Sequence, residues 1–244
     1  MLRSLLFNLA FYVATAAFLL VGSPLLLAPR SWAMAGLVAH ARVCCWLLRV
    51  IAGTKIEVRG RENLPAGAAL IAAKHQSAWD TFGLIPLLHD PAVVMKAELG
   101  WIPVYGWFSH KFGMIFVSRE KRAAALRRLM RDARDRAAAG RHVLIFAEGT
   151  RRPPGAPPDY KPGVAALYEA LDVPCIPLAL NSGLFWPRRS FHRLPGTVIV
   201  QFLTPIPPGL GRKPFMILLA DRIETATSAL VAEARDASIG NKYK

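Results

Sequence analysis

The chain has 244 residues, enough for one sizeable hydrophobic core with an appendage. Hydrophobic residues make up 53% of it and the mean hydropathy is +0.30, which is high for a freely soluble domain and indicates membrane contact. An excess of 31 Lys and Arg over 16 Asp and Glu gives a net charge of +15, which favours an anionic partner. The sequence contains no zinc-finger spacing, aromatic RNA-binding signature or basic heptad region, so we favour a lipid surface over nucleic acid.

The amino-terminal segment is apolar. No charged residue lies between Arg3 and Arg30, and residues 22–24, Gly-Ser-Pro, should break or kink a helix. Residues 5–27 are just long enough to cross a bilayer, whereas the part before the break is not. A cleavable signal is disfavoured because no Ala-x-Ala site precedes a polar start.

The next stretch, residues 31–51, carries Arg42 and Arg49 on nearly the same helix face, which is typical of a helix lying in the membrane interface. We predict that residues 1–52 form a helical pair that dips into the membrane and returns. One true span, and a hydrophobic helix packed on its own domain, are the alternatives.

From residue 54 onwards, short strands alternate with helices, which indicates a largely parallel α/β sheet flanked by helices. We expect strands at 54–59, 69–73, 92–96, 113–118, 142–147, 175–181 and 197–203. We expect helices at 81–88, 121–139, 162–171 and 214–236. Cys44, Cys45 and Cys175 fit neither a metal motif nor a disulfide framework, so we predict free thiols and no metal site.

His75 and Asp80 form the first candidate catalytic pair. They follow the predicted strand 69–73, and the carboxyl ends of strands are where open α/β sheets bind ligands. On a continuous helix, five positions would place them about 140° apart, so they meet only if the backbone turns between them. A carboxylate at one imidazole nitrogen leaves the other free to take a proton from an alcohol. The alternative for these residues alone is a buried histidine beside an aspartate that caps helix 81–88.

Other stretches at strand ends suit a phosphorylated substrate. Residues 113–119 end a strand with Arg119 at the start of a helix, where a phosphate is favoured. In residues 148–151, Gly149 permits close backbone approach, Thr150 and Arg151 can donate to phosphate oxygens, and Glu148 is better placed to orient than to catalyse. The two prolines of residues 173–177 can shape a wall for an acyl chain.

Together and in this order, these stretches resemble the four motifs of the glycerolipid acyltransferase family, and most closely its bacterial 1-acyl-sn-glycerol-3-phosphate acyltransferases. His75 and Asp80 match the His-x4-Asp pair, and residues 113–119 match the second motif. Residues 148–151 match the Glu-Gly-Thr-Arg motif, and residues 173–177 match the proline motif. The segment 161–163, Lys-Pro-Gly, resembles the one that follows the third motif, and the resemblance covers roughly residues 54–203.

The resemblance implies an acyltransferase domain at 53–244 behind membrane-associated helices at 1–52. It implies transfer of a fatty acyl group from acyl-CoA or acyl-carrier protein, as co-substrate and without a cofactor, to the sn-2 hydroxyl of lysophosphatidate, giving phosphatidate. His75 would be the base and Asp80 would orient it. The residues implied in substrate binding are Lys96, Gly113, Arg119, Glu148, Gly149, Thr150, Arg151 and Lys161. The expected location is an anionic phospholipid membrane, the bacterial inner (cytoplasmic) membrane, with the catalytic domain facing the cytoplasm.

Three alternatives remain at this point. A hydrolase with Ser77 as nucleophile is disfavoured because the chain lacks a Gly-x-Ser-x-Gly elbow. Acylation of a lyso-aminolipid such as lyso-ornithine lipid, or of glycerol-3-phosphate, would use similar motifs. A non-catalytic basic protein that binds membranes or nucleic acid would make the motifs coincidental.

Overall fold

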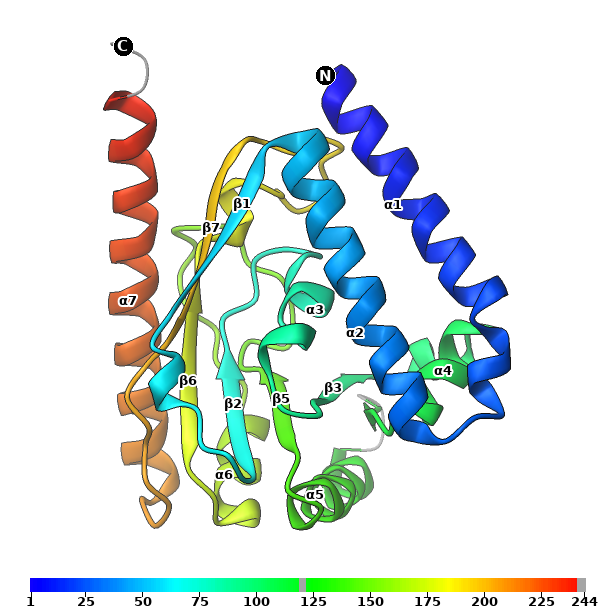
Figure 1. Cartoon of the computed structure of the whole chain (residues 1–244). Coiled ribbons are helices and arrows are strands. Elements are labelled where there is room, and N and C mark those ends of the chain that lie inside the picture. Colours follow the sequence, from blue (N-terminus) through cyan, green and yellow to red (C-terminus); the bar gives the residue numbers. More distant parts are fainter. Residues whose placement is uncertain (119–121, 241–244) are drawn as a thin grey trace.

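One seven-stranded sheet lies at the centre of the computed structural model, which describes residues 1–118 and 122–240 (Figure 1). Its spatial order is β1-β7-β6-β2-β5-β3-β4. All neighbouring strands run parallel except β6 and β7, which are antiparallel. The strands are β1 (Thr54–Arg59), β2 (Ala69–Ala73), β3 (Ala92–Lys96), β4 (Ile115–Val117), β5 (His142–Phe146), β6 (Cys175–Leu180) and β7 (Gly196–Phe202).

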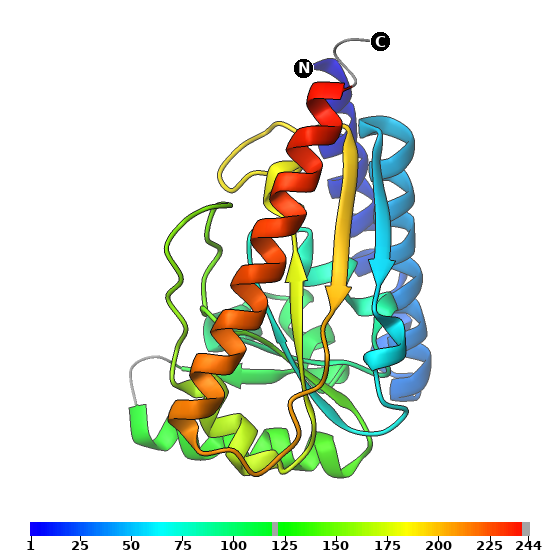
Figure 2. The ribbon, with the colours of Figure 1, turned by 90° about the vertical axis from the view of Figure 1, so that its left-hand side faces the viewer.

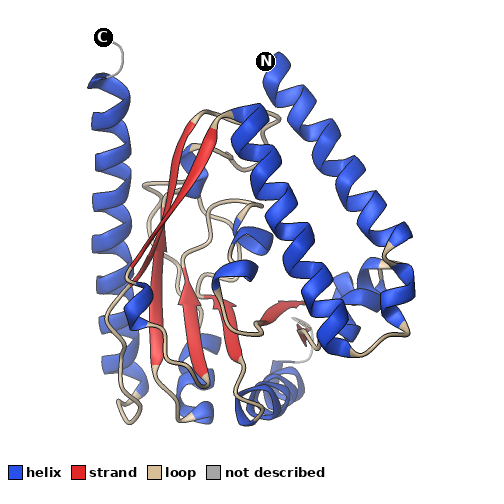
Figure 3. Ribbon diagram, viewed as in Figure 1, coloured by secondary structure: helices blue, strands red, loops and turns tan. Residues whose placement is uncertain are grey.

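Helices cover both faces of this sheet (Figure 3). One face carries α1 (Leu2–Val21), α2 (Arg30–Leu47) with a π-helical extension (Leu48–Ala52), α3 (Asp80–Gly83) and α4 (Tyr105–Lys111). The other face carries α5 (Arg122–Ala138), α6 (Gly163–Leu171) and α7 (Arg212–Gly240), and Figure 2 shows α7 lying across β6. Short 3-10 turns are η1 (Ser23–Leu26), η3 (Arg61–Asn63), η4 (Ile85–Leu87), η5 (Ala97–Trp101) and η6 (Ser182–Leu184).

The central strands alternate between two hydrophobic cores. In β2, Ala69, Ile71 and Ala73 face the core under α1 and α2, whereas Leu70 and Ala72 face the core under α6 and α7. This period of two follows from strand geometry, and both sets are fully buried. Strands buried on both faces read as continuous apolar runs, which is why the sequence revealed them.

The amino-terminal helices contribute to the first of these cores. Phe7 of α1 and Ala33 and Ala41 of α2 are fully buried. Arg3 donates to the carbonyl of Ile51 at 2.8 Å, which joins the ends of the pair. Both helices are long and apolar enough to cross a membrane. The division of the chain after residue 52 stays a prediction, and the two parts share a core.

The predicted elements are mostly confirmed. All seven strands form, with ends within two residues of those expected, and the sheet is mostly parallel. The Gly-Ser-Pro break ends α1 at Val21, as predicted. The helix 121–139 is found as α5, and residue 121 lies outside the described residues.

One predicted helix is wrong and another was missed. The expected helix 81–88 is only α3 followed by η4, because Pro86 cannot donate a backbone hydrogen bond in a continuing helix. The short α4 was not expected. It contains Gly106, whose missing side chain lets it approach the carbonyl oxygen of Gly100, and it follows Val104 at a φ of 63°.

Candidate active site

Three loops meet at the carboxyl edge of the sheet. β2 lies between β5 and β6, and all three strands are parallel to one another. The segments that leave them begin with Lys74 after β2, Ala147 after β5 and Asn181 after β6. This edge is where parallel sheets bind ligands, and it brings together residues that are about 100 positions apart in the chain.

The side chains of His75 and Asp80 meet there. Nδ1 of His75 lies 2.9 Å from Oδ2 of Asp80. The same oxygen accepts the backbone N–H groups of Gln76 at 2.8 Å and Ser77 at 2.9 Å, so the chain turns around the carboxylate. The alternative, in which Asp80 caps the following helix, is not found, because Asp80 is the first residue of α3 and its side chain bonds to preceding residues instead.

The carboxylate of Asp80 is fixed by a fourth donor. Its Oδ1 accepts the hydroxyl of Ser182 at 2.5 Å, and both residues are fully buried. Hydrogen bonds to an ionised group stabilise the charged form. Since a carboxylate only accepts, Nδ1 of His75 must carry the proton, which leaves the lone pair on Nε2.

The imidazole of His75 is held between its carboxylate and an aromatic ring. The Phe146 ring of β5 stacks on it, with centroids 3.9 Å apart and an interplanar angle of 18°. The residue keeps 8% of its surface exposed, and its Nε2 atom makes no hydrogen bond to the described residues. The ring is therefore orientated and has a free nitrogen available to accept a proton.

Ser77 does not face this ring. Its hydroxyl accepts the backbone N–H of Trp79 at 3.1 Å, and the residue is fully buried. A serine nucleophile needs its hydroxyl against the imidazole. The arrangement gives no support to the Ser77 hydrolase alternative.

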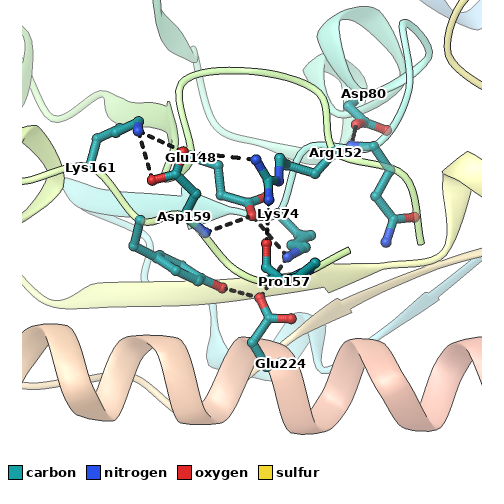
Figure 4. Close-up of polar contacts among 10 residues, drawn as sticks. Lys74, Asp80, Glu148, Arg152, Pro157, Asp159, Lys161 and Glu224 are labelled. Carbon is teal, nitrogen blue, oxygen red and sulfur yellow. Dashed lines mark hydrogen bonds and ion pairs between the residues drawn. The ribbon is translucent and has the colours of Figure 1, made fainter. Parts of the chain in front are cut away.

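A buried ion cluster involves Lys74, the residue just before His75 (Figure 4). The ammonium of Lys74 contacts Glu148 at 3.1 Å and Glu224 of α7 at 2.6 Å. Glu148 is fully buried and Lys74 nearly so, whereas the side chain of Glu224 is 28% exposed. Burial, with the adjacent charge of Glu224, raises the pKa of the Tyr160 hydroxyl, which stays protonated and donates to Glu224 at 2.8 Å. The cluster ties the start of the His75 loop to α7.

The loop after β5 is anchored to the His75 loop. The backbone N–H of Arg152 donates to the carbonyl of His75 at 2.8 Å. Gly149 has a φ of 62°, which favours glycine, and its N–H closes a turn on the carbonyl of Phe146. Arg151 is exposed and Thr150 half-buried. These bonds hold the backbone of the loop that contains Thr150 and Arg151 beside the segment that carries His75.

Glu148 and Lys161 hold the same loop from below. Oε1 of Glu148 accepts the backbone N–H of Asp159 at 3.3 Å. The N–H of Lys161 donates to the carbonyl of Ala147, and its exposed ammonium pairs with Asp159 at 2.6 Å. Glu148 thus lies inside the protein, whereas Lys161 reaches the surface.

Two of the remaining predicted residues, Lys96 and Gly113, lie on β3 and just before β4, away from the loops that leave β2, β5 and β6. Lys96 is exposed at the carboxyl end of β3 and pairs in register with Val117 of β4. Gly113 lies at the opposite, amino end of β4, where its carbonyl accepts Nε of Arg136 at 2.9 Å. Arg119 lies outside the described residues.

Several residues of the site escaped the sequence analysis. They are Lys74, Phe146, Ser182 and Glu224, and none belongs to a spacing pattern that marks a site. Ser182 shares one signal with His75, since both are polar residues two positions after the end of a buried strand. Glu224 gives no such signal, because it is one acid among several on a long helix.

Comparisons with known proteins agree with this geometry. A family model described as Acyltransferase matches residues 55–181, which include the loops after β2 and β5. The 1-acyl-sn-glycerol-3-phosphate acyltransferase of Pseudomonas aeruginosa is 36% identical over 193 residues, 79% of this chain and 75% of that protein. The one from Saccharomyces cerevisiae is 30% identical over 68% of this chain and 56% of its own length.

A solved structure has a similar fold. The crystal structure of the 1-acyl-sn-glycerophosphate acyltransferase from Thermotoga maritima superposes with a TM-score of 0.79. The match covers 94% of this chain and 96% of that chain, at 20% sequence identity. Because the sequence identity is this low, the similarity between the two structures shows a shared fold alone.

Proposed function

The chain belongs to the acyltransferase family, and from that premise we propose that it transfers a fatty acyl group to the sn-2 hydroxyl of lysophosphatidate, forming phosphatidate. The donor is acyl-CoA or acyl-carrier protein, and no cofactor takes part. The observation that carries the proposal is the bonded His75–Asp80 pair, in which Nε2 of His75 makes no hydrogen bond to the described residues. The alternative of a non-catalytic basic protein does not apply to a member of an enzyme family.

The His75–Asp80 pair assists the one step that needs catalysis, which is removal of the proton from the acceptor hydroxyl. A thioester is already an activated acyl group, whereas a secondary alcohol is a poor nucleophile at neutral pH. Nε2 of His75 takes the hydroxyl proton as the alcohol oxygen bonds to the thioester carbonyl carbon. The carbon–sulfur bond then breaks, and the thiolate takes the proton from the imidazolium. Such a base supplies about 10²–10⁴ in rate.

The neighbouring loop suits the phosphate of the acceptor. In lysophosphatidate the carbon that bears the reacting hydroxyl adjoins the one that bears the phosphate ester, so base and phosphate site must be close. The bond from Arg152 N–H to the His75 carbonyl supports this role for Arg151, because it holds the adjacent backbone beside His75 and the exposed guanidinium can pair with a phosphate. Thr150 would complete this site, Gly149 would shape its loop, and the exposed ammonium of Lys161 on the same loop would add positive charge.

The α1–α2 pair suits attachment to the inner membrane with the catalytic domain in the cytoplasm. α2 packs on the domain along much of its length, from Ala33 to Ala52, so the pair fits one leaflet better than a span. The acceptor is itself a lipid. A site next to membrane-embedded helices meets it without extracting it into water.

The proposal is tested with the purified chain in mixed micelles. Labelled acyl-CoA is offered with lysophosphatidate, lyso-ornithine lipid and glycerol-3-phosphate, and we expect transfer to lysophosphatidate to dominate. His75→Ala should lower that rate by about 10²–10⁴ while the fold, followed by circular dichroism, is retained. His89→Ala, an exposed histidine at the other edge of the sheet, is the matched control and should keep its activity. Preference for another acceptor would overturn the substrate, and an active His75→Ala would overturn the mechanism.

A further inference from the structure

Exposed large apolar residues gather on one part of the molecule. α1 presents a stripe that includes Leu2, Leu5 and Leu9, each more than 60% exposed, and α2 presents Trp32 and Trp46. Beyond residue 52, the described part of the chain exposes such residues in two segments, with a single further one, Ile217 on α7. An exposed apolar surface this large marks a contact with another phase or molecule.

The first segment is η5 with α4, which the sequence analysis did not single out. Trp101 is 85% exposed, Ile102 45% and Trp107 58%. The inner side of α4 packs against the last turn of α1, with the rings of Phe18 and Phe108 5.3 Å apart. Figure 1 shows α4 beside the end of α1 that leads into η1.

The second segment is the loop 186–195, which carries Phe191 at 83% exposure. The carbonyl of Phe191 accepts Nδ2 of Asn8 at 2.9 Å, and the Ser4 hydroxyl accepts the N–H of Arg193 at 3.0 Å. This loop therefore adjoins the first two turns of α1. Arg189, which is exposed, lies two residues from Phe191.

The two segments thus stand at opposite ends of one helix, which is about 30 Å long. Trp, with an apolar ring and a polar N–H, favours the headgroup region of a bilayer, and exposed arginines beside an aromatic residue favour anionic lipid. We propose that α4 with η5, and the loop 186–195, insert into the same anionic leaflet as α1. α1 then lies along the membrane surface with an aromatic anchor at each end. This inference rests on the membrane contact of the α1–α2 pair proposed above.

A position-specific probe tests it. Single cysteines replace Trp107, Phe191, Leu9 or Ile217 in the full chain with Cys45→Ala, since Cys44 and Cys175 are buried. Each is labelled with a fluorophore that brightens in apolar surroundings and is mixed with phosphatidylglycerol vesicles. A nitroxide on the lipid headgroup then quenches labels that enter the bilayer.

We expect the emission at Trp107→Cys and Phe191→Cys to rise several-fold with vesicles and to be quenched, as at Leu9→Cys on α1. Ile217→Cys, equally exposed but on α7, should not respond. If the labels at positions 107 and 191 stay unchanged with vesicles, like the label at position 217, while the label at position 9 brightens, this inference is overturned. The membrane attachment of the α1–α2 pair would then still stand. Brightening without vesicles would assign these segments to a second copy of the chain. If the label at position 9 also stays unchanged, both this inference and the membrane attachment of the α1–α2 pair are overturned. The acyl-transfer assay would still test the proposed catalysis independently.

Discussion

Asp80 depends on a hydroxyl from a distant loop. Ser182 donates to Oδ1 of Asp80, whereas His75 and two backbone groups use Oδ2. Without Ser182 the carboxylate can rotate, and the imidazole that it holds rotates with it. A hydrogen bond to a charged group contributes about 1.5–3 kcal/mol.

We therefore expect Ser182→Ala to lower the free energy of unfolding by about 1.5–3 kcal/mol and kcat by about tenfold. KM for the acceptor should be unchanged, because Ser182 is buried and does not reach the substrate. The measurement is steady-state kinetics beside urea unfolding. Ser77→Ala, an equally buried serine, is the control and should retain kcat. A loss confined to KM would rule out this positioning role.

The candidate site was partly predictable from residues that lie close together in the sequence. His75 and Asp80 were found because the whole pair fits within six residues. Ser182 was missed because its contact with Asp80 exists only once β6 pairs with β2, and no local pattern contains that pairing. Gly113 was grouped with the substrate residues by its motif, but the direction of β4 puts it at the far edge of the sheet.

At the scale of elements, strands were easier to predict than short helices. β2 and β5 are apolar throughout because helices cover both of their faces, and such runs are visible in the sequence. α4 has only seven residues, and its position depends on the close approach of Gly106 to Gly100. α3 ends early because Pro86 follows it. These features depend on single residues and tertiary contacts, which periodicity does not reveal.

The ion cluster makes α7 part of the support of the site. Glu224 of α7 shares the buried ammonium of Lys74 with Glu148. We expect Glu224→Gln to lower the free energy of unfolding by about 1–3 kcal/mol, since a nearly buried cation loses one of two carboxylates. Glu233→Gln on the same helix breaks only a surface ion pair with Arg59. This substitution should change the free energy of unfolding by less than about 1 kcal/mol. If urea unfolding shows equal losses of unfolding free energy for the two variants, the buried cluster contributes no more to stability than a surface ion pair.

A second ion pair joins α2 to the start of β3. Burial would raise the pKa of Asp90, but hydrogen bonds from Arg30 and the charge of Arg141 outweigh it and lower the pKa. A lowered carboxyl pKa stabilises the fold fully above the unfolded value of about 3.9, and this contribution is lost as the pH falls through the folded value.

Asp90→Asn should therefore destabilise the chain most at neutral pH and progressively less below about pH 4. Urea unfolding in detergent between neutral and acidic pH measures this difference. Asp221→Asn, an exposed acid on α7 without an ion pair among the described residues, is the control. A destabilisation by Asp90→Asn that does not change with pH would assign the effect to packing instead of charge.

For the whole molecule, the proposed membrane attachment would combine an apolar and an electrostatic part. The net charge of +15 attracts anionic lipid, and each basic side chain near the surface contributes about 1 kcal/mol. The apolar part would come from α1 and α2, which expose large apolar side chains and are long and apolar enough to cross a membrane. Salt screens only the first part, since in about 1 M NaCl the screening length is about 3 Å.

We therefore expect the chain to stay in the membrane pellet when membranes are washed with about 1 M NaCl, and to leave it with detergent. The fraction in each sample is measured by immunoblotting after centrifugation, with a peripheral basic protein as the control that salt releases. The reason is that release would return the exposed apolar side chains of α1 and α2 to water, a cost that salt does not remove. Complete release by salt alone would mean that the helices pack on the domain without entering lipid, and attachment would then be electrostatic.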